Sequence, residues 1–298
     1  MTTHTLTPSP ASKKLISVRS LRKRFAVWNV GKWLVAILWF LVTVFPVWWM
    51  FNVVFTDPGS PIAINPRLYP SSLTAGINNI STILSESQFL SSYVVSLSFA
   101  LLQVGGMLLI CSMAAFEFGL FKFPGKNILF FIALSALMVP FVVTLIPTYR
   151  IVANLKWLNS IQGLAVPGMA SAFGLFLLRQ FMENLPHELM DAAEIDGAGH
   201  FGTYWFVALP LSYNGLITLG VLGFMFAWGS FIWPLVVNSK AQWYTVSLAV
   251  SKYLSTQSWS PPEVTMTASF LAALPPVIFY VALQRFIVQG IALTGLKG

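Results

Sequence analysis

The chain has 298 residues, of which 56% are apolar and only 9% are charged, and its mean hydropathy is +0.75. A soluble domain of this length needs far more charge to cover its surface, so the composition excludes that class. It predicts an all-α membrane protein whose spans form one helical bundle. The net charge of +8 does not indicate a nucleic-acid partner, because seven of the 17 basic residues precede the first apolar run instead of forming a stripe on a soluble domain.

Residues 1–32 form a basic arm that we expect on the cytoplasmic side of the membrane. Apolar residues recur at helical spacing between its cations, which predicts a helix lying in the membrane interface. The next run, 33–55, is longer than the apolar part of a signal peptide and has no small-residue cleavage site after it, so we expect a retained first span. The apolar residues of the arm's helix are Leu15, Val18, Leu21 and Phe25, and the cations are Lys13, Lys14, Arg19, Arg22, Lys23, Arg24 and Lys32.

Six apolar runs are candidates for membrane spans. Together they define a transmembrane domain, 33–288, followed by a short C-terminal tail, 289–298. If the N-terminus lies inside, the inner segments hold twelve Lys and Arg residues and the outer segments hold five, which predicts that both termini are cytoplasmic. Prolines occur in several runs, and we expect ordinary helices to accommodate most of them. The runs are 33–55, 92–116, 128–149, 161–182, 208–236 and 267–288.

The sequence lacks the groups that would drive transport from within this chain. No Asp, Glu, Lys or Arg lies deep in any run, which disfavours an ion-coupled carrier, although backbone carbonyls can also bind sodium. The segment GLFKFPGKN places five residues between its glycines and Asn after Lys, so it is not a phosphate-binding loop. One Cys and three His provide no disulfide, metal site or catalytic group. We therefore expect a non-catalytic membrane subunit that takes its energy from another chain.

Five of the nine acidic residues fall between positions 183 and 196, in a polar segment flanked by apolar runs. Pro186 suits the first position of a helix, with Asn184 or Leu185 at the cap, and Gly197 suits its end because glycine readily adopts positive φ. Leu185, Leu189, Ala192 and Ala193 would form a narrow apolar face. We expect a short amphipathic helix on the cytoplasmic side; the alternative is a solvated loop whose acids only avoid translocation.

The segment DAAEIDGAGHFGTYWFVALP resembles the EAA loop of ABC importer permeases, here within 183–210. Asp191-Ala192-Ala193 stands where that family usually has Glu-Ala-Ala, and Gly197 and Leu209-Pro210 follow at the family's spacing. The terminal segment QRFIVQGIALTGLKG is similar to the C-terminal signature of the second permease subunit of maltose-type sugar importers. Asp191 keeps the usual charge but shortens its reach by one methylene group. The resemblance covers residue 33 to the end.

The resemblance implies a type I ABC importer permease of six spans with a cytoplasmic coupling helix, located in the bacterial inner membrane. It implies that this helix docks on a partner ATPase, which binds ATP and Mg²⁺, so that this chain needs no cofactor or metal. The other implied protein partners are a second homologous permease, with which this chain forms a heterodimer, a second ATPase subunit and an extracytoplasmic sugar-binding protein. The implied substrate is a sugar, with oligosaccharides expected, and the chain also contacts membrane lipid. The implied docking residues are Glu188, Leu189, Asp191, Ala192, Ala193, Asp196, Gly197 and Ala198, and the tail residues Gly295, Lys297 and Gly298 are implied to contact the ATPase.

Aromatic residues of the fifth run are candidates for a sugar pathway, because pyranose rings stack on aromatic faces; ordinary packing is the alternative for each. The outer segment from Asn238 to Thr265 resembles the loop of these importers that reaches toward the binding protein. The outer segments carry a net charge of +2, which leaves neutral and acidic sugars both open. As functions, an ion-coupled carrier acting alone and a membrane scaffold also remain open. The pathway candidates are Phe224, Trp228, Phe231 and Trp233, and the candidates for contact with the binding protein are Gln257, Ser258 and Trp259.

Overall fold

The structure of the chain is a computed structural model that describes residues 18–57, 59, 68–253 and 261–295. Regular structure in these ranges is entirely helical, which confirms the all-α prediction. The chain divides into two compact units, 1–49 and 50–298, and the second holds the packed core and the candidate sites. The candidates Gln257, Ser258, Trp259, Lys297 and Gly298 lie outside the described residues.

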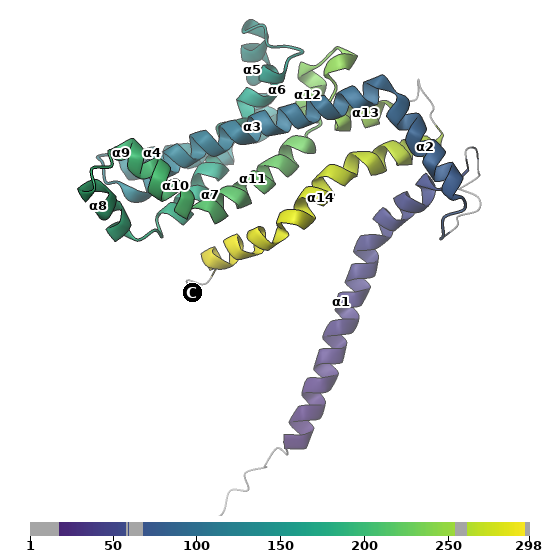
Figure 1. Cartoon of the computed structure of the whole chain (residues 1–298), viewed down its shortest axis with the longest axis horizontal. Coiled ribbons are helices and arrows are strands. Elements are labelled where there is room, and N and C mark those ends of the chain that lie inside the picture. Colours follow the sequence, from purple (N-terminus) through teal and green to yellow (C-terminus); the bar gives the residue numbers. More distant parts are fainter. Residues whose placement is uncertain (1–17, 58, 60–67, 254–260, 296–298) are drawn as a thin grey trace, which may run out of the picture. The chain divides into compact units, whose positions relative to one another are not determined.

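Three helices are long: α1 (Val18–Val54), α3 (Ser87–Leu120) and α14 (Pro262–Gly295) (Figure 1). The shorter α-helices are α2 (Leu73–Ser85), α4 (Lys126–Ser135), α5 (Phe141–Asn154), α6 (Ile161–Ala165), α7 (Ala172–Met182), α8 (His187–Ile195), α9 (His200–Thr203), α10 (Leu209–Leu211), α11 (Tyr213–Trp228), α12 (Ile232–Val237) and α13 (Val246–Tyr253). Short 3₁₀ turns are η1 (Ala136–Met138), η2 (Val166–Gly168) and η4 (Ala241–Trp243), and η3 (Tyr204–Ala208) is a π-helical turn.

Among the described residues, three helices can each cross a membrane, and three bent helix pairs bring the number of candidate spans to six. Gly31–Val54, Ser87–Leu120 and Pro262–Arg285 are long and apolar enough to cross a membrane singly. The other three spans are broken: α4–η1 meets α5 at 101°, α6–η2 meets α7 at 51°, and α9–α10 meets α11 at 75°. If each bent pair counts as one span, the number agrees with the six predicted from the sequence.

Two expectations about boundaries differ from the structure. Residues from Val18 onward belong to the same helix as the first span, so the backbone shows no separate interfacial helix, because nothing in that stretch terminates a helix. The fifth run was expected to continue to residue 236, but α11 ends at Trp228 and α12 begins at Ile232. Gly229 and Ser230, which favour irregular backbone, occupy the break between them.

Most of the prolines lie within continuous helices, as expected. Pro46 is inside α1, Pro147 is inside α5, and the pair Pro275–Pro276 is inside α14. Pro140 and Pro167 instead mark the breaks of the third and fourth spans. Each helical proline lacks the N–H that would bond to the carbonyl four residues earlier, so it leaves a carbonyl that needs another donor.

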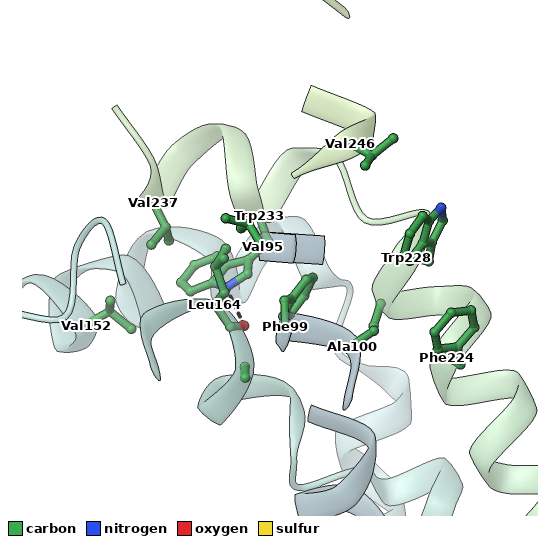
Figure 2. Packing of buried hydrophobic residues seen from close by; sticks show 12 residues of the cluster. Val95, Phe99, Ala100, Val152, Leu164, Phe224, Trp228, Trp233, Val237 and Val246 are labelled. Carbon is green, nitrogen blue, oxygen red and sulfur yellow. Dashed lines mark hydrogen bonds between the residues drawn. The ribbon is translucent and has the colours of Figure 1, made fainter. Parts of the chain in front are cut away.

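Two tryptophans donate to carbonyls of this kind. Pro276 leaves the carbonyl of Ala272 without its helical partner, and the indole Nε1 of Trp228 donates to that oxygen at 3.0 Å. Pro167 does the same to the carbonyl of Gly163, and Trp233 Nε1 lies 3.2 Å from both that oxygen and the neighbouring carbonyl oxygen of Leu164 (Figure 2). Both indoles are therefore structural caps within the aromatic cluster.

Helix α3 is the element on which the unit of residues 50–298 is assembled, with α7, α11 and α13 packed along it (Figure 1). Close approach depends on glycines. A Cβ on Gly223 of α11 would lie 2.2 Å from Met107 of α3, and one on Gly174 of α7 would lie 2.9 Å from Cys111. The two large apolar clusters of the core both include residues of α3, one near each end.

Replacing Trp228 or Trp233 by Phe should lower the free energy of unfolding by about 1–3 kcal/mol, because each change leaves a buried carbonyl without a donor. Trp243→Phe is the matched control, since its partly buried indole has no such bond among the described residues. Thermal unfolding of the purified protein in detergent measures the difference.

A double-mutant cycle identifies the cause of that loss. The change Pro276→Ala restores the N–H that reaches Ala272, so Trp228→Phe should cost much less in that background. Additive effects of Trp228→Phe and Pro276→Ala would show that the indole contributes only by packing.

Candidate functional site

The acidic segment forms helix α8, His187–Ile195, as the sequence predicted. Its start lies one residue later than expected: Pro186 is the cap residue, with extended ψ of 123°, and is not the first helical residue. The expected caps, Asn184 and Leu185, were wrong because Pro186 itself makes the transition into the helix. Glu188 lies in the first turn, where the helix dipole favours a carboxylate.

The end of α8 is a Schellman motif centred on Gly197. This glycine has φ of +81°, which confirms the predicted left-handed stop. The N–H of Ala198 bonds to the carbonyl of Ala193 at 2.9 Å, and the N–H of Gly197 bonds to the carbonyl of Glu194 at 3.0 Å. These two bonds satisfy carbonyls that a helix end leaves free, so the segment after α8 leaves at a fixed angle.

Ala192 and Ala193, the two adjacent alanines of the EAA-like segment, point to different sides of α8. Met190 and Ala193 are 8% and 9% exposed and face the chain's own core, where Met190 joins the cluster of residues at the predicted cytoplasmic end of α3. Ala192 is exposed and lies on a face with Leu189 (43% exposed) and Ile195 (86% exposed). The free apolar face of α8 therefore follows the spacing 189, 192 and 195, and the sequence interpretation missed both Met190 and Ile195.

A hollow of about 780 Å³ lies beside α8, between it and the turn that follows α3. Asp191 and Glu194 contribute carboxylates to its wall, and Lys122 from the turn contributes an amine. Gly197 and Ala198 also line it. Among the predicted docking residues, the structure thus brings Asp191, Gly197 and Ala198 together around one concave surface, while Glu188, Leu189 and Ala192 lie on the exposed outer side of the helix.

The segment after α8 is attached to the end of α3 by polar and aromatic contacts. His200 Nε2 lies 2.5 Å from Glu117 Oε1, and the imidazole packs against the rings of Phe116 and Phe121, with centroids 5.2 and 4.3 Å away. The hydroxyl of Tyr204 lies 2.8 Å from that of Ser112. Sequence reasoning did not connect these residues, because 83 and 92 positions separate the two polar pairs.

Arg179 joins three helices at the same end of the bundle. Its Nε donates to the carbonyl of Phe118 near the end of α3 at 2.9 Å, and its guanidinium lies 4.0 Å over the ring of Phe130 in α4. A further nitrogen lies 3.5 Å from the carboxylate of Glu183, one turn along from Arg179 at the end of α7. Arginine suits this position because its planar group can stack on a ring and donate sideways at the same time.

Three of the four predicted pathway aromatics are core residues. Phe224, Trp228 and Trp233 are buried in one cluster, with the Phe224 and Trp228 rings 5.6 Å apart (Figure 2). Phe231 is 38% exposed. Packing and carbonyl capping account for the two tryptophans. Gly295, from the predicted tail contact, is the last residue of α14. Within the described ranges, no group of three or more His, Cys, Asp or Glu residues is placed to hold a metal.

Comparison with known proteins covers nearly the whole chain. The sequence is 31% identical over 271 residues to the sn-glycerol-3-phosphate transport system permease protein UgpE of Rhizobium meliloti (strain 1021), covering 88% of this chain and 95% of that protein. It is 36% identical over 219 residues to the protein of the same name from Yersinia pestis bv. Antiqua (strain Antiqua), covering 73% of this chain and 76% of that one.

The fold is similar to a chain of a bacterial ABC transporter involved in the import of the acidic polysaccharide alginate, with a TM-score of 0.78, 18% identity, and 87% of this chain and 96% of that chain covered. A family model described as the inner membrane component of binding-protein-dependent transport systems matches residues 106–293, which include α8, the hollow beside it and its anchor on α3. The chain therefore belongs to the family of inner membrane components of binding-protein-dependent transport systems.

Proposed function

We propose that this chain is the permease subunit of an ATP-driven, binding-protein-dependent sugar importer, and that α8 is where a separate ATPase drives it. The observation that carries the proposal is the exposed apolar face of α8 within a chain of this family. An exposed Leu189, Ala192 and Ile195 on a short helix with a fixed end form a surface of the size that a cleft in a partner accepts. The exposed acids Glu188 and Asp191 flank that face and suit a basic rim.

Movement of the ATPase would reach the spans through contacts within this chain. Met190 and Ala193 pack α8 against the core. His200 and Tyr204 attach the segment after α8 to α3 through their contacts with Glu117 and Ser112. Because α3 carries α7 and α11 along its length, a displacement of α8 moves several spans together. Such a rigid group supports alternating access by rocking against a second permease subunit.

The proposed assembly contains a second homologous permease, two cytoplasmic ATPase subunits and an extracytoplasmic sugar-binding protein, in the bacterial inner membrane with both termini in the cytoplasm. A further solved relative supports the binding protein as a partner: a bacterial alginate ABC transporter in complex with an alginate-pentasaccharide-bound periplasmic protein, with a TM-score of 0.62 and 12% identity over 89% of this chain and 94% of that chain. Gln257, Ser258 and Trp259 remain our proposed contacts with that partner.

The substrate class rests on the relatives. Their names specify glycerol 3-phosphate and alginate, both of which are rich in hydroxyl groups. We propose a sugar or a related polyhydroxylated compound. The tail, with Gly295, Lys297 and Gly298, is proposed to contact the ATPase pair, whose subunits would bind the ATP and Mg²⁺. An ion-coupled carrier acting alone gains no support from the family, and neither does a scaffold.

Affinity purification from native membranes should recover an ATPase subunit and a second permease with this chain. In liposomes, the assembly should hydrolyse ATP faster when a sugar-loaded binding protein is added, and a panel of binding proteins would identify the sugar. Uptake by this chain alone, driven by an ion gradient, would contradict the proposal.

Ala192→Trp should lower sugar-stimulated ATP hydrolysis by about tenfold or more, since overpacking a close interface costs more than ~1.4 kcal/mol. The purified chain should keep its melting temperature, because Ala192 is exposed. Ala193→Trp is the matched variant. Its side chain faces the core, so the melting temperature itself should fall. Gly197→Pro should also uncouple hydrolysis, because proline cannot adopt φ of +81°. Normal stimulation in Ala192→Trp would show that α8 docks by another face.

Glu117→Gln and His200→Ala should each reduce the transport obtained per ATP by about two- to fivefold, since a side-chain hydrogen bond of this kind contributes ~0.5–1 kcal/mol. The double variant should be no worse than either single one, because both remove the same contact. Glu183→Gln is the control, since it removes an ion pair to Arg179 one turn away along the chain and leaves the attachment of α9 to α3 intact. Equal losses in the control would assign the effect to surface charge in general.

A further inference from the structure

A second cavity, of about 370 Å³, lies at the place where three spans lose their helical geometry. Phe141 is the first residue after the break between α4–η1 and α5, Gly168 belongs to the break between α6 and α7, and Ser230 belongs to the break after α11. All three line the cavity. Irregular backbone within a membrane span is tolerated where it is buried in protein or borders a wet cavity, and such breaks often surround a transported ligand.

The cavity contains hydrogen-bonding groups that the chain itself does not use. Gln103 lies at the middle of α3, with its carboxamide directly over the backbone of Gly168, where an added Cβ would lie 2.5 Å from Oε1. In the part of the chain that the structure describes, the side chains of Gln103, Thr148 and Ser230 make no hydrogen bond, although all three are partly buried. These three side chains therefore have donors and acceptors available to a polar ligand or to water.

The remaining wall combines aromatic surface with an absence of charge. The ring of Phe226 is mostly exposed, that of Phe141 is half exposed, and the buried Trp233 also borders the cavity. None of the residues that line it is acidic or basic. A phosphate or carboxylate placed there would lose its hydration with no cation to replace it, which is costly at this depth. Hydroxyl groups need only neutral donors and acceptors.

We propose that this cavity is a binding subsite for one uncharged sugar ring, with Gln103 as its specificity-determining residue. The volume is near the low end of the range for small-molecule sites, roughly 300–1,000 Å³. The carboxamide offers a donor and an acceptor to adjacent hydroxyl groups, and the rings of Phe141 and Phe226 offer apolar surface for the face of the sugar. The inference rests on the proposed function and makes it narrower: the substrate presents a neutral ring to this subunit, whatever charge it carries elsewhere.

The direct test is protection of introduced cysteines in the assembled importer. In a Cys111→Ala background, Thr148→Cys and Ser230→Cys are labelled with a small polar maleimide, and Ser135→Cys is the control. Ser135 is at the end of α4 and does not line the cavity. The probes are a neutral disaccharide, glycerol 3-phosphate and an oligouronate, each at millimolar concentration. We expect the disaccharide to slow labelling of the first two cysteines severalfold, with no effect on the control and none from the anions.

A binding measurement gives an independent readout. Equilibrium binding of the radiolabelled disaccharide to the importer without its binding protein should weaken about two- to tenfold in Gln103→Ala, the effect of losing one or two neutral hydrogen bonds. Gly168→Ala should weaken binding similarly, because the new methyl group displaces the carboxamide, whereas Ser135→Ala should not. Equal protection by the anions, or unchanged binding in Gln103→Ala, would overturn the subsite. Stimulation of the wild-type complex by loaded binding protein would leave the permease function standing in either case.

Discussion

The backbone hydrogen bond is the constraint on which this structure depends. A chain that crosses a membrane must satisfy its N–H and C=O groups internally, and this chain interrupts three of its six spans. The interruptions are possible because other groups take over the lost bonds. Ser171 caps α7 by accepting from the N–H of Gly174, and the indole of Trp233 donates to the carbonyl of Gly163, which Pro167 leaves free in the interrupted fourth span. The indole of Trp228 does the same for a carbonyl within the continuous helix α14.

The side chains that replace the lost backbone hydrogen bonds also determine where a functional site can form. Breaks supported by side chains leave space beside them, and the cavity around Gln103 lies beside two of the three breaks, those in the third and fourth spans, and beside the end of α11. At the other end of α3, the glycine stop after α8 and the pair formed by Glu117 and His200 fix a helix that leaves its apolar face free. The same long helix thus borders a ligand-sized cavity at its middle and anchors α8 at its end.

The sequence predicted the features that depend on local pattern. Apolar runs located the six spans, and the acidic segment with Gly197 located α8 and its end, because helix period and glycine conformation act over a few residues. It could not assign the two adjacent alanines, since neighbours on a helix point in directions about 100° apart and either could have been the outer one. It also could not foresee that Trp228 and Trp233 cap carbonyls, because an indole that caps a distant carbonyl has the same local pattern as one that faces a ligand.

The distribution of charge separates the steps of transport. Lys240, in a predicted outer segment, lies in a loop, whereas the cavity at the middle of α3 has an uncharged lining. An anionic substrate would be attracted at the outer surface but would gain nothing from this subunit at depth, where a fixed cation would hold it too strongly to release. A neutral lining binds a sugar weakly through hydroxyl groups and lets it leave when the spans rock. Under the proposed function, weak neutral recognition suits this permease, because the energy that a partner ATPase would supply at α8 has only to move helices and not to extract an ion.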